Sequence, residues 1–224
     1  MKKIAVIGLG LLGRTVAREL ASQGAEVIAV DLDGDLVQSV ADEVTLAVRL
    51  DSTHREALLS QGIEQVDAAL VAIGKNFEAA VLTTALLKEL GVRRVVSRAT
   101  TEEEAKILKL VNADQVVLVE EWVGRRLARQ ITSPSLVDMV ELSPGMSLAR
   151  IEAPDEMWGK TLAAVKFRQR YGLNVVAVIK PEGKAREHPT TLLPDPEELV
   201  EEGDVLLVDG PDDAISRLAS SGEE

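Results

Sequence analysis

The feature that most constrains the fold is a glycine run, Gly8-Leu9-Gly10-Leu11-Leu12-Gly13. It follows a short apolar segment at residues 4–7 and opens an amphipathic helical pattern at residues 14–22. In such a strand–turn–helix unit the first glycine permits the tight turn and the second lets the backbone approach a pyrophosphate. The third lets helix and strand pack closely. The run therefore predicts a βαβ unit whose helix N-terminus holds the phosphates of a nucleotide.

Short apolar segments alternate with helical patterns over the first 120 residues. They predict strands at residues 4–7, 26–30, 45–49, 68–72, 94–97 and 115–118. Nearly continuous apolar character is typical of strands covered on both faces of a parallel sheet. The clearest helical pattern covers residues 76–90, and Gly91 ends it. We therefore expect an α/β fold with a Rossmann-like, doubly wound parallel sheet.

The pattern changes after Glu120. A helix is predicted at residues 122–131, and a polar break containing a proline follows it. We place a domain boundary there, which gives a first domain at residues 1–134 and a second at residues 135–224. The second domain is expected to be a small α+β domain. Its predicted elements are strands at residues 139–142, 147–151, 175–179 and 205–208, a helix at 161–171, and a hairpin turn at 180–183 leading to a strand at 185–186.

Candidate ligand-binding residues lie where the predicted strands of the first domain end. Ligands of open α/β sheets bind beyond the carboxyl ends of the strands, so these residues are expected to meet in one crevice. Asp31, 18 residues after Gly13, is placed to accept hydrogen bonds from ribose hydroxyls and would repel a 2′-phosphate. The strand ends expected to point into this crevice are residues 50–52, residues 72–76 and Arg98. Besides the glycine run and Asp31, the candidate ligand-binding residues are Leu32, Asp51, Ser52, Ala72, Ile73, Gly74, Lys75 and Arg98.

Composition excludes several classes of function. The chain has no cysteine, which removes disulfides, thiolate metal sites and a cysteine nucleophile. Aromatic residues make up 2%, too few for stacking single-stranded nucleic acid. The net charge is −12, and residues 135–224 hold 18 Asp and Glu against 9 Lys and Arg. This balance disfavours DNA as a partner, and no nucleic-acid partner is expected.

Catalytic chemistry has little support in the sequence. A dehydrogenase needs a proton-transferring group beside its cofactor, and neither His54 nor His188 stands in a motif for that task. We therefore expect a binding protein rather than an enzyme. Two alternatives remain open: a small NAD-dependent oxidoreductase, and a redox-sensing repressor, which would need a basic DNA-reading module that the acidic second domain does not offer.

The motifs taken together resemble a known family, the RCK-domain regulators of bacterial potassium uptake of the TrkA/KtrA type. In the first domain the likeness is carried by residues 4–13, 26–31, 71–74 and 82–90. In the second it is carried by Arg168-Gln169-Arg170-Tyr171-Gly172 and Glu202-Gly203-Asp204-Val205-Leu206. The resemblance implies a RCK N-terminal domain followed by a RCK C-terminal, or TrkA-C, domain. It covers nearly the whole chain in the same order.

The resemblance also implies ligands. The first domain would bind ATP, ADP or NAD(H) through the candidate residues named above. Glu120 matches a position that holds a divalent cation, Mg²⁺ or Ca²⁺, between subunits. Arg168 and Asn174 fall where some members contact cyclic di-AMP. One departure concerns Leu11, because KtrA-type proteins often carry an arginine there that helps to recognise a γ-phosphate.

A partner and a location follow from the same resemblance. Family members form dimers that assemble into an octameric ring. The ring sits at the inner face of the cell membrane, in the cytoplasm, against a potassium-translocating subunit of the KtrB/TrkH type. The bound nucleotide would then control potassium transport by favouring one ring shape over another.

Overall fold

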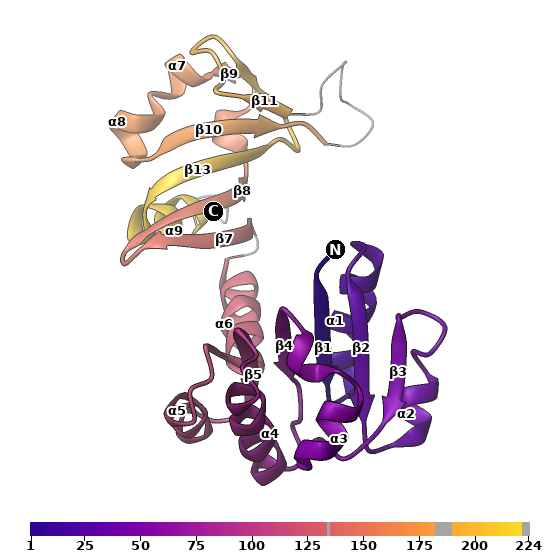
Figure 1. Ribbon diagram of the computed structural model, residues 1–224. Coiled ribbons are helices and arrows are strands. Elements are labelled where there is room, and N and C mark those ends of the chain that lie inside the picture. Colours follow the sequence, from indigo (N-terminus) through magenta and orange to yellow (C-terminus); the bar gives the residue numbers. More distant parts are fainter. Residues whose placement is uncertain (134, 182–189, 221–224) are drawn as a thin grey trace. The chain divides into compact units, whose positions relative to one another are not determined.

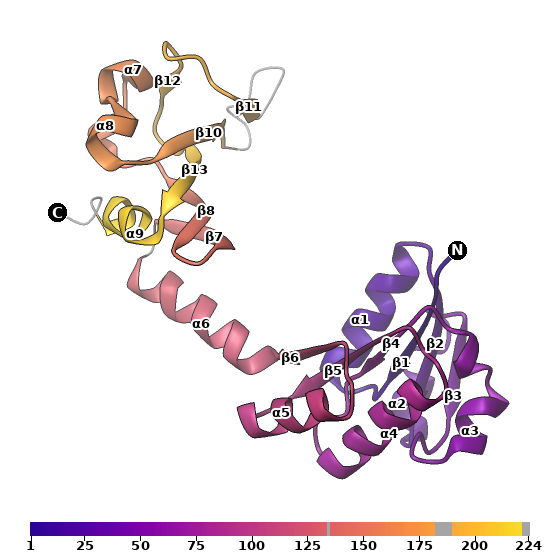
Figure 2. The ribbon, with the colours of Figure 1, turned by 60° about the vertical axis from the view of Figure 1, so that its left-hand side comes forward.

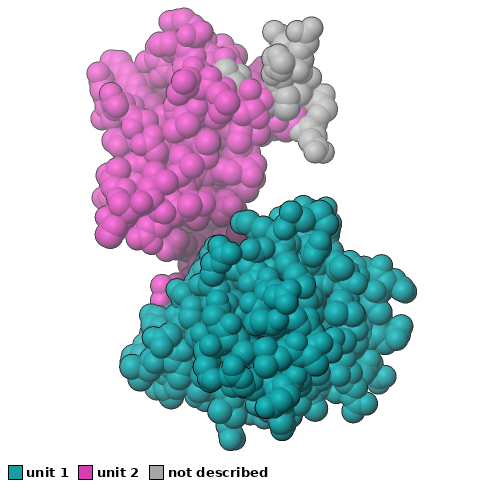
Figure 3. Space-filling model, viewed as in Figure 1, with its two compact units in different colours: residues 1–122 teal, residues 123–224 magenta. Residues whose placement is uncertain are grey.

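The computed structural model describes residues 1–133, 135–181 and 190–220. They form two compact units, residues 1–122 and residues 123–224 (Figure 3). The division after residue 122 falls twelve residues before the boundary predicted at residue 134. It lies inside the helix that links the two units. That boundary stays a prediction, and each unit is described by itself.

The first unit contains one six-stranded parallel sheet (Figure 1). Its strands are β1 (Lys3–Ile7), β2 (Glu26–Asp31), β3 (Leu46–Arg49), β4 (Ala68–Val71), β5 (Arg94–Ala99) and β6 (Gln115–Leu118). Their order in the sheet is β3-β2-β1-β4-β5-β6, and every neighbouring pair is parallel. Successive strands are added toward one edge of the sheet from β1 to β3 and toward the other edge from β4 to β6. The strand order therefore reverses between β1 and β4, as in a doubly wound dinucleotide-binding fold. The expected fold class is confirmed.

Helices cover both faces of this sheet. They are α1 (Leu11–Ser22), α2 (Gly34–Gln38), α3 (Arg55–Ser60), α4 (Phe77–Glu89) and α5 (Glu102–Leu110), with a short 3₁₀ turn at Ile63–Gln65. Alternate side chains of β1 enter different cores, because successive residues of a strand point to opposite faces. Ala5 and Ile7 pack with Leu87 of α4, whereas Val6 packs with Ala17 of α1. This two-sided burial explains the continuous apolar strands.

A longer helix, α6 (Val119–Thr132), begins directly after β6. It starts three residues before the predicted position, and none of its described residues is buried. Trp122, Leu127 and Ile131 expose much of their apolar surface. Within the described residues, no helix is both long enough and apolar enough to cross a membrane.

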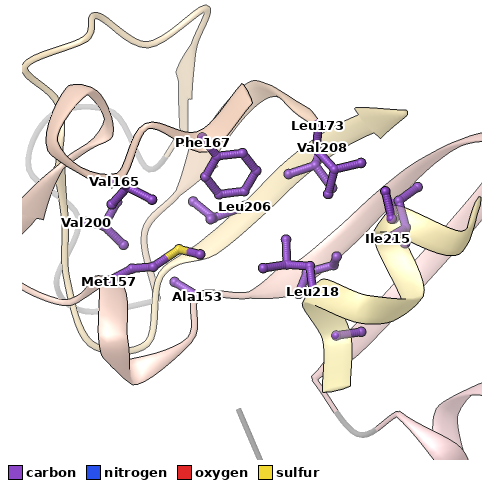
Figure 4. Close-up of a cluster of buried hydrophobic side chains, with 14 of the residues drawn as sticks. Ala153, Met157, Val165, Phe167, Leu173, Val200, Leu206, Val208, Ile215 and Leu218 are labelled. Carbon is purple, nitrogen blue, oxygen red and sulfur yellow. The ribbon is translucent and has the colours of Figure 1, made fainter. Parts of the chain in front are cut away.

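The second unit is a small α+β domain, as expected. A five-stranded antiparallel sheet has the order β11-β10-β13-β8-β7, and β9 pairs with β12 beside it. Phe167, Leu206, Val208, Ile215 and Leu218 meet in the core between the sheet and its helices (Figure 4). The elements are β7 (Leu136–Ser143), β8 (Met146–Glu152), β9 (Lys160–Thr161), α7 (Leu162–Val165), α8 (Phe167–Tyr171), β10 (Asn174–Ile179), β11 (Thr190–Leu192), β12 (Leu199–Val200), β13 (Val205–Pro211) and α9 (Asp212–Ser220), with a 3₁₀ turn at Asp155–Met157.

Two predictions in this unit need comment. The single helix expected at residues 161–171 is wrong, because Lys166 has a left-handed backbone (φ 52°) that ends α7 before α8 begins (Figure 2). The strand expected at residues 185–186 lies outside the described residues. Among those described, the antiparallel partner that follows β10 is β11.

Candidate nucleotide-binding site

A pocket of about 600 Å³ opens at the carboxyl ends of β1, β2 and β4. These ends lie level in the sheet, since Ile7 pairs in register with both Val30 and Val71. A crevice at this position, where strand order reverses, is the usual ligand site of an open α/β sheet. The pocket is lined by Ile7, Gly8, Gly10, Leu11, Val30, Asp31, Leu32, Asp33, Leu36, Leu50, Asp51, Ser52, Ala72, Ile73, Gly74, Lys75, Asn76, Ala79 and Arg98.

Two of the three motif glycines are required by the fold itself. Gly8 has a positive φ of 93°, and a Cβ there would approach the backbone of Ala72 and Ile73 to 2.9 Å. A Cβ on Gly13 would overlap the carbonyl oxygen of Gly8. Both glycines therefore let α1 and β4 pack tightly around the turn.

Gly10 has no such structural reason. A Cβ built on it would meet no atom of the described chain within 4 Å, and its φ of −59° suits any residue. Gly10 also caps α1, where no side chain of the described residues satisfies the helix amides. Helix N-termini attract anions because their first N–H groups are free and the helix dipole is positive there. Space kept open at Gly10 therefore suits a phosphate.

The Asp31 carboxylate is held by the backbone. Its Oδ2 accepts a hydrogen bond from the Leu9 amide at 2.5 Å, and its Oδ1 accepts one from the Asp33 amide at 2.9 Å. These bonds fix the carboxylate at the pocket edge, where the sequence places the ribose. Asp33 also lines the pocket and was not predicted, although an Asp two residues after the motif Asp was a visible signal.

Asp51 and Ser52 follow β3 and differ in what they offer to the pocket. Asp51 Oδ1 accepts hydrogen bonds from the Thr53 hydroxyl at 2.6 Å and the Thr53 amide at 2.9 Å. These bonds lower the pKa of the Asp51 carboxyl, which keeps it ionised. The Ser52 hydroxyl instead shares a hydrogen bond with buried Thr83 at 2.8 Å, so it faces the core.

The opposite side of the pocket carries positive charge. Lys75 follows β4, and Arg98 reaches the pocket from β5. The Arg98 guanidinium lies so close to Gly74 that a Cβ there would collide with it. Arg98 also forms an ion pair with Glu120 at the start of α6. The pocket thus has carboxylates near β2 and β3 and cations near β4 and β5.

Most of the predicted site residues are brought together, and three are not. Leu9, Leu12 and Gly13 lie outside the lining, and Leu9 is fully buried in the core under α1. Leu50 and Asn76 also line the pocket and belong to the strand ends that are expected to face the crevice. The lining residues that were not predicted, apart from Asp33, are Ile7, Val30, Leu36 and Ala79. These four are apolar, and nothing in their sequence pattern separates pocket lining from core.

The cation site predicted at Glu120 has no cluster to support it within one chain. Among the described residues, no group of three or more His, Cys, Asp or Glu side chains gathers around a common point. The Glu120 carboxylate is paired with Arg98 instead. A cation held between subunits stays a prediction.

Arg168 and Asn174 lie together in the second unit. Arg168 Nε donates a hydrogen bond to Asn174 Oδ1 at 2.7 Å, and Asn174 Nδ2 donates one to Asp209 at 3.1 Å. Both residues line an open hollow of about 380 Å³ beside Lys166, Pro194 and other residues of α7, α8 and the segment after β11.

Comparison with known proteins places the chain in a family. The TrkA-N domain matches residues 4–119, and the TrkA-C domain matches residues 146–221. The Ktr system potassium uptake protein C of Bacillus subtilis is 37% identical over 217 residues, which are 97% of this chain and 96% of that protein. The Ktr system potassium uptake protein A of the same organism is 33% identical over 221 residues, 99% of this chain and 97% of that protein.

Solved structures agree on the fold. The GsuK channel aligns with a TM-score of 0.70 at 19% identity, over 100% of this chain and 40% of the channel chain. The GsuK channel bound to NAD aligns with a TM-score of 0.54 at 25% identity, over 97% of this chain and 38% of that chain. This chain therefore belongs to the RCK-domain family of Ktr and Trk potassium uptake regulatory proteins, a non-enzymatic family with a TrkA-N domain followed by a TrkA-C domain.

Proposed function

We propose that the pocket of the first unit binds an adenine nucleotide, ATP, ADP or NAD(H). We further propose that the identity of the bound nucleotide controls potassium transport. The observation that carries the proposal is Gly10, whose missing side chain leaves open space beside a helix N-terminus. A fold-only explanation accounts for Gly8 and Gly13 but not for Gly10. Related channel structures with bound NAD and bound ADP support the same ligand class.

The charges of the pocket suit one orientation of such a ligand. The phosphates would lie at the start of α1, within reach of Lys75 and Arg98, and the ribose would lie against Asp31. Asp33 brings a second carboxylate to the ribose side. A ribose 2′-phosphate would meet both carboxylates, so NADP and NADPH are expected to bind much more weakly than NAD(H).

The partner is proposed from the names of the relatives. The similarity to Ktr system potassium uptake proteins supports an association of this chain with a membrane-embedded, potassium-translocating Ktr subunit. We place this chain at the cytoplasmic face of such a subunit. We further propose that copies assemble into dimers and then an octameric gating ring. A nucleotide that binds one ring shape more tightly than another would shift the equilibrium toward it and so open or close the pore.

The proposal is tested first by ligand-induced stabilisation. Purified protein is heated with ATP, ADP, NAD, NADH or NADPH, since a ligand that binds the folded state raises the melting temperature. At least one of the first four should raise it by several degrees. Gly10→Asp should remove the rise, because a carboxylate would enter the space kept for phosphate.

The matched control is Gly124→Asp, which puts the same side chain into open space on α6. It should keep the ligand-induced rise. If no adenine nucleotide stabilises the protein, or if Gly10→Asp retains the rise, the proposed site is wrong. Size measurement on the same samples tests the octamer, and potassium flux with the membrane subunit tests control of transport.

We also propose the hollow of the second unit as a site for cyclic di-AMP. Arg168 supplies a cation, and Lys166 lies beside it in the lining. An additional rise in melting temperature with cyclic di-AMP, lost in Arg168→Ala and kept in Arg217→Ala, would support this ligand. Arg217 serves as the control because it pairs with Asp213 on α9 and does not line the hollow.

A further inference from the structure

Arg98 has two roles available to it. It lines the proposed nucleotide pocket, and it forms an ion pair with Glu120 in the first turn of α6. Both groups belong to the first unit, where β5 and β6 lie side by side in the sheet. One guanidinium therefore stands between the pocket and the start of the linking helix.

The two partners of this ion pair are held very differently. Arg98 lies against Gly74, and its side chain is 22% exposed. Its Nε is buried and has no hydrogen-bond partner in the part of the chain that the structure describes. Glu120 is 60% exposed. The arginine is thus fixed in the pocket wall with an unsatisfied donor, whereas the carboxylate is a solvent-accessible partner that can move away.

We propose that Arg98 exchanges Glu120 for a phosphate of the bound nucleotide, so that pocket occupancy releases the first turn of α6. This inference rests on the proposed function and specifies how the site acts. A phosphate offers a guanidinium several oxygens and suits its forked donors better than a single carboxylate oxygen. An exposed carboxylate, in contrast, gains little from an ion pair because water screens it.

The exchange distinguishes ligands by whether they carry a phosphate that lies beside Gly74, next to Arg98. A ligand with a phosphate there takes Arg98 and leaves Glu120 free. A ligand without one leaves the ion pair intact. Since a ligand shifts an equilibrium only through different contacts in the two states, this contact supplies the difference that regulation needs.

Competition for Arg98 predicts that a substitution outside the pocket lining increases the affinity for nucleotide. If Glu120 and a phosphate compete for Arg98, removing the charge of Glu120 should strengthen nucleotide binding. We expect Glu120→Gln to bind ADP about two- to fivefold more tightly than the wild type, measured by calorimetry in EDTA. Glu121→Gln removes the same charge from the same helical turn and corrects for the general electrostatic effect. Affinity for adenosine, which has no phosphate, should be unchanged in Glu120→Gln.

A second substitution tests whether the effect passes through Arg98. Arg98→Gln should weaken ADP binding, and adding Glu120→Gln to it should produce no further gain. If Arg98→Gln does not fold, Arg98→Met serves instead, because methionine removes the charge and keeps a long, flexible side chain. If neither Arg98 variant folds, the comparison of Glu120→Gln with Glu121→Gln still tests the exchange.

The outcomes separate the two proposals. If Glu120→Gln binds ADP equally to or more weakly than Glu121→Gln, the exchange is wrong even though the pocket binds nucleotide. If Glu120→Gln gains affinity in the Arg98→Gln background as well, Arg98 is not the shared group and the exchange is again wrong. If the wild type binds no adenine nucleotide, the proposed function itself fails, and the exchange fails with it.

Discussion

The backbone amide of Leu9 donates a hydrogen bond to the Asp31 carboxylate, and this bond joins the glycine turn after β1 to the end of β2. A second amide, from Asp33, binds the other carboxylate oxygen. The acidic residue of the motif therefore organises the turn as well as facing the pocket. Fold and site share one group at this point, and substitution of Asp31 should affect both.

We expect Asp31→Asn to lower the free energy of unfolding by about 1–2 kcal/mol and to weaken nucleotide binding about tenfold. Asparagine keeps one acceptor oxygen but turns an NH₂ group toward the other backbone amide. Urea unfolding and calorimetry measure the two effects. The control is Asp67→Asn. The Asp67 carboxylate accepts a hydrogen bond from the Lys3 amide at 2.9 Å and does not line the pocket. Equal losses of affinity in both variants would contradict a ligand role for Asp31.

The motif glycines should separate into two kinds. Gly13→Ala is expected to lower the free energy of unfolding by about 1–3 kcal/mol, because its Cβ would overlap the Gly8 carbonyl. Gly10→Ala should change the free energy of unfolding by less than about 1 kcal/mol. Its methyl group meets open space and the unfolded chain loses freedom, whereas alanine is a poorer N-cap for α1 than glycine. Denaturant unfolding without ligand measures both. A large loss in Gly10→Ala would show that the fold itself needs that glycine.

The sheet could be predicted from the sequence, and the reason is physical. Strands such as β1, with side chains buried on both faces, produce continuous apolar runs that few other structures need. Asp31 and the residues of the glycine run carry their own local signals. These local patterns were sufficient for the fold class and for most of the polar pocket residues.

Other features depend on contacts that a linear pattern does not contain. The left-handed Lys166 that separates α7 from α8 is not a glycine, so its sequence gives no sign of a break. Leu36 and Ala79 line the pocket but have the same apolar character as core residues. The Arg98–Glu120 pair joins two residues 22 positions apart. The resemblance implies a cation at Glu120, and its arginine partner is evident only from the structure.

Stability should depend on Asp114 in acid. Lys88 Nζ donates a hydrogen bond to its carboxylate at 2.8 Å and the Val95 amide donates another, which lowers the pKa of Asp114 from its ordinary value of 3.8. A lowered folded-state pKa means that the stabilisation is complete above the unfolded pKa and is lost as the pH falls through the folded one. The difference in melting temperature between wild type and Asp114→Asn should therefore be constant from pH 5 to 7 and shrink below about pH 4. A constant difference down to pH 2 would contradict this assignment.

A buried ion pair should control the stability of the second unit. Lys180 Nζ lies 2.8 Å from Oδ2 of Asp204, a residue with no exposed surface, and the Glu201 amide donates to the same oxygen at 2.8 Å. Burial is the largest single effect and acts to lower the pKa of Lys180. The hydrogen bonds that Lys180 donates to Asp204 and Glu201, together with the negative charges of these carboxylates, outweigh burial, and the pKa is raised. The lysine is therefore charged at neutral pH and compensates the buried carboxylate.

Lys180→Met is expected to cost about 3–5 kcal/mol in the unfolding of this unit, because it leaves an uncompensated charge in the interior. Lys180→Met combined with Asp204→Asn should recover a large part of the loss, since the neutral amide can still accept from Glu201. Lys160→Met, which removes an exposed lysine bonded to the Glu156 carbonyl, should cost less than about 1 kcal/mol. Urea unfolding at pH 7 compares the three. Because the pair lies wholly in the second unit, nucleotide binding to the first should be unchanged in every variant, and a loss of affinity in Lys180→Met would mean that the two units are energetically coupled.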